Sequence, residues 1–454
     1  MNSISTPFSI KNIRLFIAFR IFFNARFYYP VFTIIFLDYG LTIDQFALLN
    51  SVWAITIFCA EVPSGVLADL FGRRRLIIAT SLLMVIEISV IAFVPIGNSD
   101  IIFCAFLINR ILSGLAEAMA SGADEAIAYD ALTEQGNAKD WPRVLSVQMR
   151  LKSLATIISM TIGALVYDPS IVNQIIVWCG GPWTLNQQTT MRFPIYLTLI
   201  LAMLSLYCAF EMEEKKSKNL SSEKINLASA FKITWQAGKW ILNTPFVLAI
   251  IIFGMSYDHI LRMITTMTSQ YYRLIDLPEA SFGLIGSAFS ILGLFVPKIA
   301  EYMVINNSPR TNVLWLSGIT IFALFGLTGF YPYWGLLPMS LAFVAMVLVT
   351  FFTSHYLNRE TASYHRATVL SFKGMAFNLA YGVVGVLFAS LLSYQRDIVM
   401  AGSTQLSQAE IETNVFKQAI EWFPWYGIFC ILLAVIFCRY IFKNTTKDKI
   451  KTKG

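Results

Sequence analysis

The chain has 454 residues, of which 56% are hydrophobic and only 13% are charged. Soluble domains carry about 25% charged residues, so this composition excludes a large soluble protein with several buried helices. The net charge is +7, which basic cytoplasmic loops and anionic lipid explain without a nucleic-acid partner. We therefore expect a polytopic membrane protein.

Apolar stretches of about 20 residues, the length of a helix that crosses a bilayer, recur along the whole chain. The first stretch is too long for the apolar region of a secretory signal, and no cleavage site follows it. The sequence thus predicts an all-α membrane protein with twelve transmembrane helices. They are placed at 12–38, 44–68, 75–96, 101–131, 143–167, 192–211, 245–272, 279–305, 311–330, 333–357, 367–393 and 421–443.

Lysine and arginine residues gather in every second loop between these spans. Cytoplasmic loops of membrane proteins carry this excess of positive charge. We therefore expect a multi-pass protein of the cytoplasmic (inner) membrane with both termini in the cytoplasm.

The longest loop separates six spans from six. We expect an N-terminal half at 1–211, a cytoplasmic linker with an amphipathic helix at 212–244, and a C-terminal half at 245–454. The amphipathic helix would lie on the inner leaflet or against the end of the bundle. A shift of 232 residues places the first span on the seventh and Asp69 on Glu301. A weak repeat of this kind is typical of transporters with two pseudo-symmetric halves.

The loop between spans two and three reads GVLADLFGRRRLI, at 65–77. Its glycines permit a tight turn and close helix approach, and its aspartate can face the positive end of a neighbouring helix. The stretch resembles the signature loop of the major facilitator superfamily, although Leu70 stands where the family has a basic residue. That resemblance implies the superfamily's fold and a conformational latch that stabilises the outward-facing state. The expected latch residues are Gly65, Asp69, Gly72, Arg73, Arg74 and, from the end of span four, Asp130.

Span four carries several charged residues. A charge at the bilayer centre costs at least about 2.5 kcal/mol, so these residues need partners or water. Arg110, Glu117 and Asp124 are spaced seven apart, which puts them on one helical face. Arg110 with Gly114 also resembles the superfamily's pattern that is linked to proton coupling in its drug and proton antiporters.

Spans one and seven hold charges at matching depths. We expect Arg26 of span one to pair with Glu117, and the 232-residue shift places Asp258 on Arg26. Asp258 and Arg262 are four apart and can pair within one helix. His259 is either a proton carrier or a hydrogen-bonded packing residue. The expected substrate and coupling residues are Arg26, Arg110, Glu117, Asp124, Asp258, His259, Arg262 and, in span eleven, Lys373.

No nucleotide-binding glycine loop, metalloprotease motif or nucleophile with its base occurs in the chain, so we expect no enzyme. The cysteines lie mostly in apolar runs, and we expect neither a metal site nor a cofactor. We predict a monomeric, proton-coupled secondary transporter that moves a small organic solute by alternating access, with efflux favoured. One alternative is an importer of a small anionic or zwitterionic metabolite or a siderophore. Another is a sensor or lipid-handling protein on the same fold.

Overall fold

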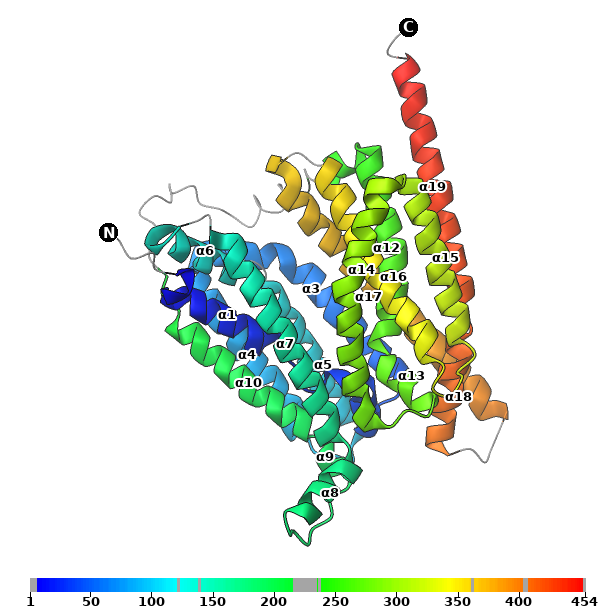
Figure 1. Cartoon of the computed structure of the whole chain (residues 1–454). Helices are drawn as coiled ribbons and strands as arrows, with labels where there is room; N and C mark the ends of the chain where they lie inside the picture. The colour runs from blue at the N-terminus through cyan, green and yellow to red at the C-terminus, as the bar shows by residue number, and fades with distance from the viewer. Residues whose placement is uncertain are drawn as a thin grey trace. The chain divides into compact units, whose positions relative to one another are not determined.

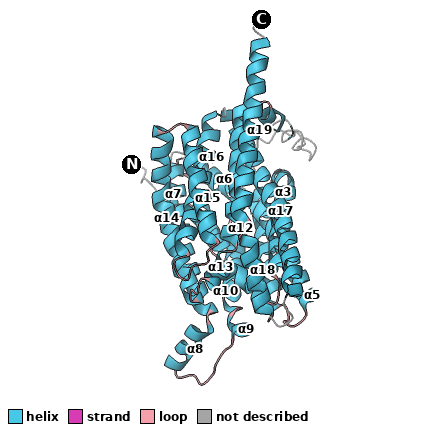
Figure 2. Ribbon diagram, turned by 90° about the vertical axis from the view of Figure 1, so that its right-hand side faces the viewer, coloured by secondary structure: helices cyan, strands magenta, loops and turns pink. Residues whose placement is uncertain are grey.

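The computed structural model describes residues 6–120, 123–137, 140–214, 235, 238–360, 363–402 and 407–451. Within these ranges every regular element is a helix, as Figure 2 shows. A chain in lipid must satisfy its own backbone N–H and C=O groups, which a helix does within one segment. The predicted all-α membrane class is confirmed.

Contacts along the chain define two compact units. Unit 1 comprises Met1–Leu41, Ile55–Ala230 and Pro278–Ser290, and unit 2 comprises Thr42–Ala54, Phe231–Leu277 and Ile291–Gly454. Each unit therefore takes most of its residues from one half of the sequence and one short segment from the other half. Both units consist of long helices that run side by side (Figure 1).

Two helices, α3 (Ile43–Phe71) and α14 (Phe282–Asn306), contribute to both units. Unit 1 otherwise contains η1 (Pro7–Ser9), α1 (Lys11–Asn24), η2 (Tyr29–Val31), α2 (Phe32–Asp38), α4 (Arg73–Phe93), α5 (Ser99–Ala120), α6 (Ala123–Gln135), α7 (Trp141–Tyr167), α8 (Pro169–Trp178), α9 (Gln187–Thr190), α10 (Phe193–Glu211) and η4 (Glu279–Ser281). Unit 2 contains α12 (Pro245–Thr266), α13 (Thr268–Leu274), α15 (Pro309–Leu327), α16 (Leu336–Glu360), α17 (Ser363–Gly402), α18 (Gln408–Ile420) and α19 (Phe423–Lys451).

In the part of the chain that the structure describes, eleven helices are long and apolar enough to cross a membrane. The expected first span at 12–38 is not among them, because it is divided into α1, η2 and α2. The seventh span also differs from the expectation, since α12 ends at Thr266 and α13 begins at Thr268. Most of the predicted linker helix, 215–234 and 236–237, lies outside the described residues.

The break in the first span has a physical cause. Pro30 supplies no backbone N–H, and Ala25 at the end of α1 is extended, with φ −76° and ψ 106°. The freed N–H of Phe27 donates instead to Thr198 Oγ1 of α10, at 3.0 Å. Gly163 of α7 packs so closely against the backbone of Phe27 that a Cβ atom there would overlap it. The irregular segment is therefore satisfied by its neighbours, as helix breaks in membranes require.

The helices that carry the candidate residues are central in each unit. In unit 1, α4 packs against α5 and α10, and α1 packs against α6, α7 and α10. In unit 2, α12 packs against α16, α17 and α19. Charged side chains on α4, α5 and α12 are consequently held among helices, where each needs a partner or access to water.

Candidate functional site

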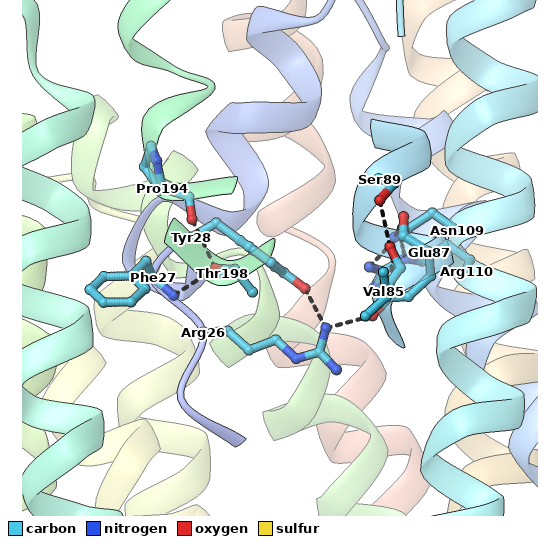
Figure 3. Close-up of polar contacts among 10 residues, drawn as sticks. All are labelled: Arg26, Phe27, Tyr28, Val85, Glu87, Ser89, Asn109, Arg110, Pro194 and Thr198. Atoms are coloured by element: carbon cyan, nitrogen blue, oxygen red, sulfur yellow. Dashed lines mark hydrogen bonds and ion pairs between the residues drawn. The ribbon is translucent and has the colours of Figure 1, made fainter. Parts of the chain in front are cut away.

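A buried ion pair joins the broken first span to α4. The Arg26 guanidinium Nη1 lies 2.6 Å from Glu87 Oε1, and the two side chains are 4% and 0% exposed. Arg26 Nη1 also donates to the Tyr28 hydroxyl at 3.1 Å. Figure 3 shows the arginine reaching from the irregular segment toward α4. The break in the helix thus presents Arg26 to a carboxylate that would otherwise be an uncompensated buried charge.

The pairing contradicts the expectation that Arg26 contacts Glu117. The partner is Glu87, which sequence reasoning did not single out. The sequence did contain an indication of Glu87, because a single carboxylate in the apolar run at 75–96 is costly unless it is paired. The prediction failed because helical periodicity gives the face of one helix and not the neighbour that it meets.

Asn109 and Arg110 of α5 extend this network. Asn109 Nδ2 donates to the backbone oxygen of Glu87 at 2.9 Å and also to its carboxylate. Arg110 donates from Nε and Nη2 to Asn109 Oδ1, at 2.9 and 2.7 Å. Its guanidinium also stacks over Phe32, 5.3 Å from the ring centroid. The network contains two guanidinium groups and one carboxylate, and Arg110 pairs with no carboxylate among the described residues.

Glu117 lies on the same face of α5 as Arg110. Seven residues cover two turns of a helix to within about 20°, so both side chains point in one direction. Ile108 is nine residues from Glu117, and Ile101 is nine from Arg110, which places each isoleucine half a turn away. Both isoleucines are exposed on a helix that can cross a membrane, so that side faces lipid. Glu117 is also exposed, and its exposure is on the opposite side.

Three further groups lie near Glu117 at longer range. Its carboxylate interacts electrostatically with Glu61 of α3, which sequence reasoning missed, and with Lys152 of α7. It also interacts with the hydroxyl of Tyr29. Glu117 has no ion-pair partner within 4.0 Å among the described residues. The structure therefore places a second carboxylate within electrostatic range of the predicted one.

Asp124 pairs with α1. Arg20 Nη2 donates to Asp124 Oδ1 at 2.8 Å, and the same nitrogen lies 3.0 Å from Glu125 Oε1. Asp124 was expected among the substrate and coupling residues, and that role stays a prediction. Asp124 pairs with Arg20 of α1, which precedes the break in the first span.

The expected latch is partly described. Arg73 Nη1 lies 2.7 Å from Asp130 Oδ2, as the sequence led us to expect. Arg74 donates to the backbone oxygens of Phe210 and Met212, at 2.7 and 2.6 Å. Gly65 and Asp69 stand at positions outside those whose side chains are described. The latch role of all these residues stays a prediction.

The turn before α4 depends on Gly72. It has φ 90° and ψ 145°, a conformation that side chains disfavour. A Cβ atom there would lie 2.9 Å from Glu214 Oε2. That carboxylate accepts the backbone N–H groups of Arg73 and Arg74, each at 3.0 Å, and so caps the helix. Nearby, hydrogen bonds to Glu211 and Glu213 raise the pKa of the exposed Lys11 ammonium above its ordinary value of 10.5.

In unit 2, the expected pair within α12 is present. Arg262 Nη2 lies 2.7 Å from Asp258 Oδ2, and Arg262 Nη1 donates to Asn378 Oδ1 of α17 at 2.8 Å. The guanidinium also stacks on Tyr381, 5.2 Å from the ring centroid. Lys373 lies on the same helix, α17, over the ring of Phe377, and interacts electrostatically with Asp258.

His259 is held between α12 and α19. Its Nδ1 lies 2.6 Å from the carbonyl oxygen of Met255, which can only accept, so Nδ1 carries the proton. Nε2 then accepts from the Tyr426 hydroxyl at 3.1 Å. These contacts correspond to the packing alternative, and a proton-carrier role for His259 stays a prediction. Among the described residues no group of three His, Cys, Asp or Glu side chains is arranged to hold a metal ion.

Comparison with known proteins agrees with this architecture. A family model described as Major Facilitator Superfamily matches residues 14–385. The chain belongs to this superfamily. As a member it is a multi-pass membrane transporter and not an enzyme. The resemblance seen in the loop at 65–77 is thereby confirmed at the level of the family.

Individual relatives of this superfamily member are distant. A quinolone resistance protein, NorA of Staphylococcus aureus, is 22% identical over 327 residues, which cover 71% of this chain and 74% of the relative. The nucleoside transporter NupG has a TM-score of 0.67 at 13% identity, with 97% of this chain and 99% of that one covered. A bacterial homologue of the lysosomal transporter Spinster has a TM-score of 0.69 at 11% identity, with 97% and 99% covered. The two solved structures show a shared fold.

Proposed function

We propose that this chain is a proton-coupled secondary transporter that exports a small organic solute by alternating access. The observation that carries the proposal is the position of Glu117. Its carboxylate is exposed on the side of α5 opposite the lipid-facing isoleucines, and it has no ion-pair partner among the described residues. A carboxylate inside a membrane helix is costly, and this cost makes it a candidate site for binding a proton or a substrate.

Protonation of Glu117 would change two interactions at once. It removes the repulsion from Glu61 and the attraction for Lys152, which belong to α3 and α7. A proton that stabilises one arrangement of these helices more than another shifts the population between inward-open and outward-open states. Two halves that rock about a site near the bilayer midplane would then exchange proton and solute.

Export is favoured over import because NorA bears the name of a quinolone resistance protein. Removal of a drug from the cell is the direct way for a transporter to give resistance. We propose that the protein lies in the cytoplasmic membrane with both termini inside, since basic residues gather in those loops. We also propose that it works as a monomer.

The test uses purified protein in liposomes with an imposed pH gradient and a fluorescent quinolone as the solute. Exchange of luminal protons for external quinolone predicts uptake when the lumen is acidic, above the passive uptake of vesicles that contain Glu117→Gln. Equal quinolone uptake by wild-type and Glu117→Gln vesicles, with the pH gradient imposed in either direction, would contradict proton coupling through Glu117.

Import of a small anionic or zwitterionic metabolite is the second candidate. It is favoured by Arg110, a buried cation with a neutral partner, and by Lys373 in unit 2. Cations of this kind clamp carboxylates. The same liposomes separate the two functions, because symport requires an acidic exterior for uptake and antiport requires an acidic lumen.

A further inference from the structure

We propose that the solute is an amphipathic zwitterion that lies along α5 in unit 1, with its anionic group at Arg110 and its cationic group at Glu117. The inference rests on the proposed function, since it names the substrate class of that transporter. It goes further because it assigns a separate charge of the solute to each end of one helical face.

The anionic group is assigned from the unequal charges around Arg110. Glu87 neutralises Arg26 at 2.6 Å, whereas Arg110 donates to the neutral amide oxygen of Asn109. Its Nη1 has no hydrogen-bond partner among the described residues. A buried guanidinium without a counter-ion is unfavourable, and a carboxylate is the group that its fork of donors fits.

The cationic group is assigned from the unpaired negative charge of Glu117, two turns further along α5. Glu117 and Glu61 approach closely enough to interact, and Lys152 lies beyond ion-pair distance of Glu117. Glu117 is exposed and has no ion-pair partner within 4.0 Å among the described residues, so no cation in direct contact neutralises it. An amine that enters this place removes the repulsion between the carboxylates and completes the balance.

The distance between the two places follows from helix geometry. Seven residues at 1.5 Å each separate Arg110 from Glu117 by about 10 Å along the axis. Tyr29 lies within electrostatic range of both residues. It is 47% exposed, so its ring can contact a solute. An aromatic or apolar body about 10 Å long would contact this ring.

Other classes of solute fit less well. A lipophilic cation would leave Arg110 without a counter-ion, and a simple anion would leave Glu61 and Glu117 repelling one another. A solute with both charges neutralises each place, so the solute's net charge is zero. The prediction concerns the arrangement of charges and applies whichever way the solute moves.

Binding of three matched probes to the detergent-purified protein tests the proposal. The first is a quinolone with a free carboxylate and a free secondary amine. Its methyl ester keeps only the cation, and its N-acetyl derivative keeps only the anion. We expect the zwitterion to bind at least about ten times more tightly than either derivative, because each lost charge removes an ion pair in a protein interior.

Variants assign the charges to residues. Glu117→Gln should abolish the preference for the zwitterion over the N-acetyl probe and keep the preference over the ester. Arg110→Gln should do the reverse, and Arg110→Lys, which keeps the charge if the glutamine variant fails to fold, should retain it in part. Asp100→Asn, an exposed position on the same helix, should leave all three affinities unchanged.

Equal binding of the zwitterion and the ester, or no binding of any probe to the wild type, would overturn the proposal. An unchanged charge preference in Glu117→Gln would do the same. Transport is measured separately in the liposomes described above. Charge-selective binding without transport would leave this inference intact and reject the proposed function, and proton-driven transport without charge selectivity would do the opposite.

Discussion

The two units treat their buried arginines differently. In unit 1, Arg26 of the irregular segment pairs with Glu87 of α4, and both side chains are almost fully buried. In unit 2, Arg262 pairs with Asp258 one turn earlier on its own helix, and the arginine is 24% exposed. The pair in unit 1 joins two separate segments through opposite charges, whereas Arg262 reaches its neighbouring helix α17 through the neutral side chains of Asn378 and Tyr381. The comparison indicates that unit 1 uses buried charge to hold its helices together.

The largest expected effect comes from the pair between helices. Glu87→Gln leaves the Arg26 guanidinium buried without a counter-ion, so we expect a loss of about 3–5 kcal/mol in the free energy of unfolding. Denaturant unfolding in detergent measures it. The double variant Arg26→Gln with Glu87→Gln should recover much of the loss. If Glu87→Gln costs no more than the substitution of Asp258, the contrast between the units does not hold.

Arg396 offers a pair between helices in unit 2. It contacts Asp44 of α3 and Glu412 of α18, at 2.9 Å from Glu412, and its side chain is 14% exposed. We expect Arg396→Gln to cost about 1.5–3 kcal/mol, the range for hydrogen bonds to charged groups. Adding Asp44→Asn should restore part of the stability, since it removes the repulsion between the remaining carboxylates. No recovery in the double variant would argue against a shared site.

A substitution at Gly72 tests whether the close contact between the turn before α4 and Glu214 contributes to stability. We expect Gly72→Ala to cost about 1–2 kcal/mol, because its positive φ disfavours a side chain and the new Cβ atom meets Glu214. Gly40 is a matched control in unit 1, with φ 98° and no atom within 4 Å of the added Cβ. Equal losses in thermal unfolding would mean that backbone strain alone is responsible and that the Glu214 contact adds nothing.

The smallest effect is expected for the pair within α12. Asp258→Asn should cost about 1 kcal/mol, because Arg262 is 24% exposed and keeps its contacts with Asn378 and Tyr381 when the carboxylate is removed. The same unfolding measurement in detergent compares it directly with Glu87→Gln. A loss as large as that of Glu87→Gln would show that Asp258 also fixes the position of α17.

Local sequence patterns predicted what depends on one helix. The pair of Asp258 and Arg262 followed from their spacing of four, and the shared face of Arg110 and Glu117 from their spacing of seven. Arg73 and Asp130 were both expected in one latch at the cytoplasmic end, and they do form an ion pair. The partner of Arg26 was predicted wrongly, and Glu61 was missed, because each depends on which helices pack together.

The sequence by itself determined the membrane class, the number of apolar stretches and the superfamily, since length, hydropathy and one loop motif are local properties. Only the tertiary structure decided that the first span breaks, that Thr198 satisfies the freed backbone, and that Glu87 neutralises Arg26. The physical reason is that a buried charge requires a counter-charge in space, and many carboxylates along the chain meet that requirement equally well until the helices are packed.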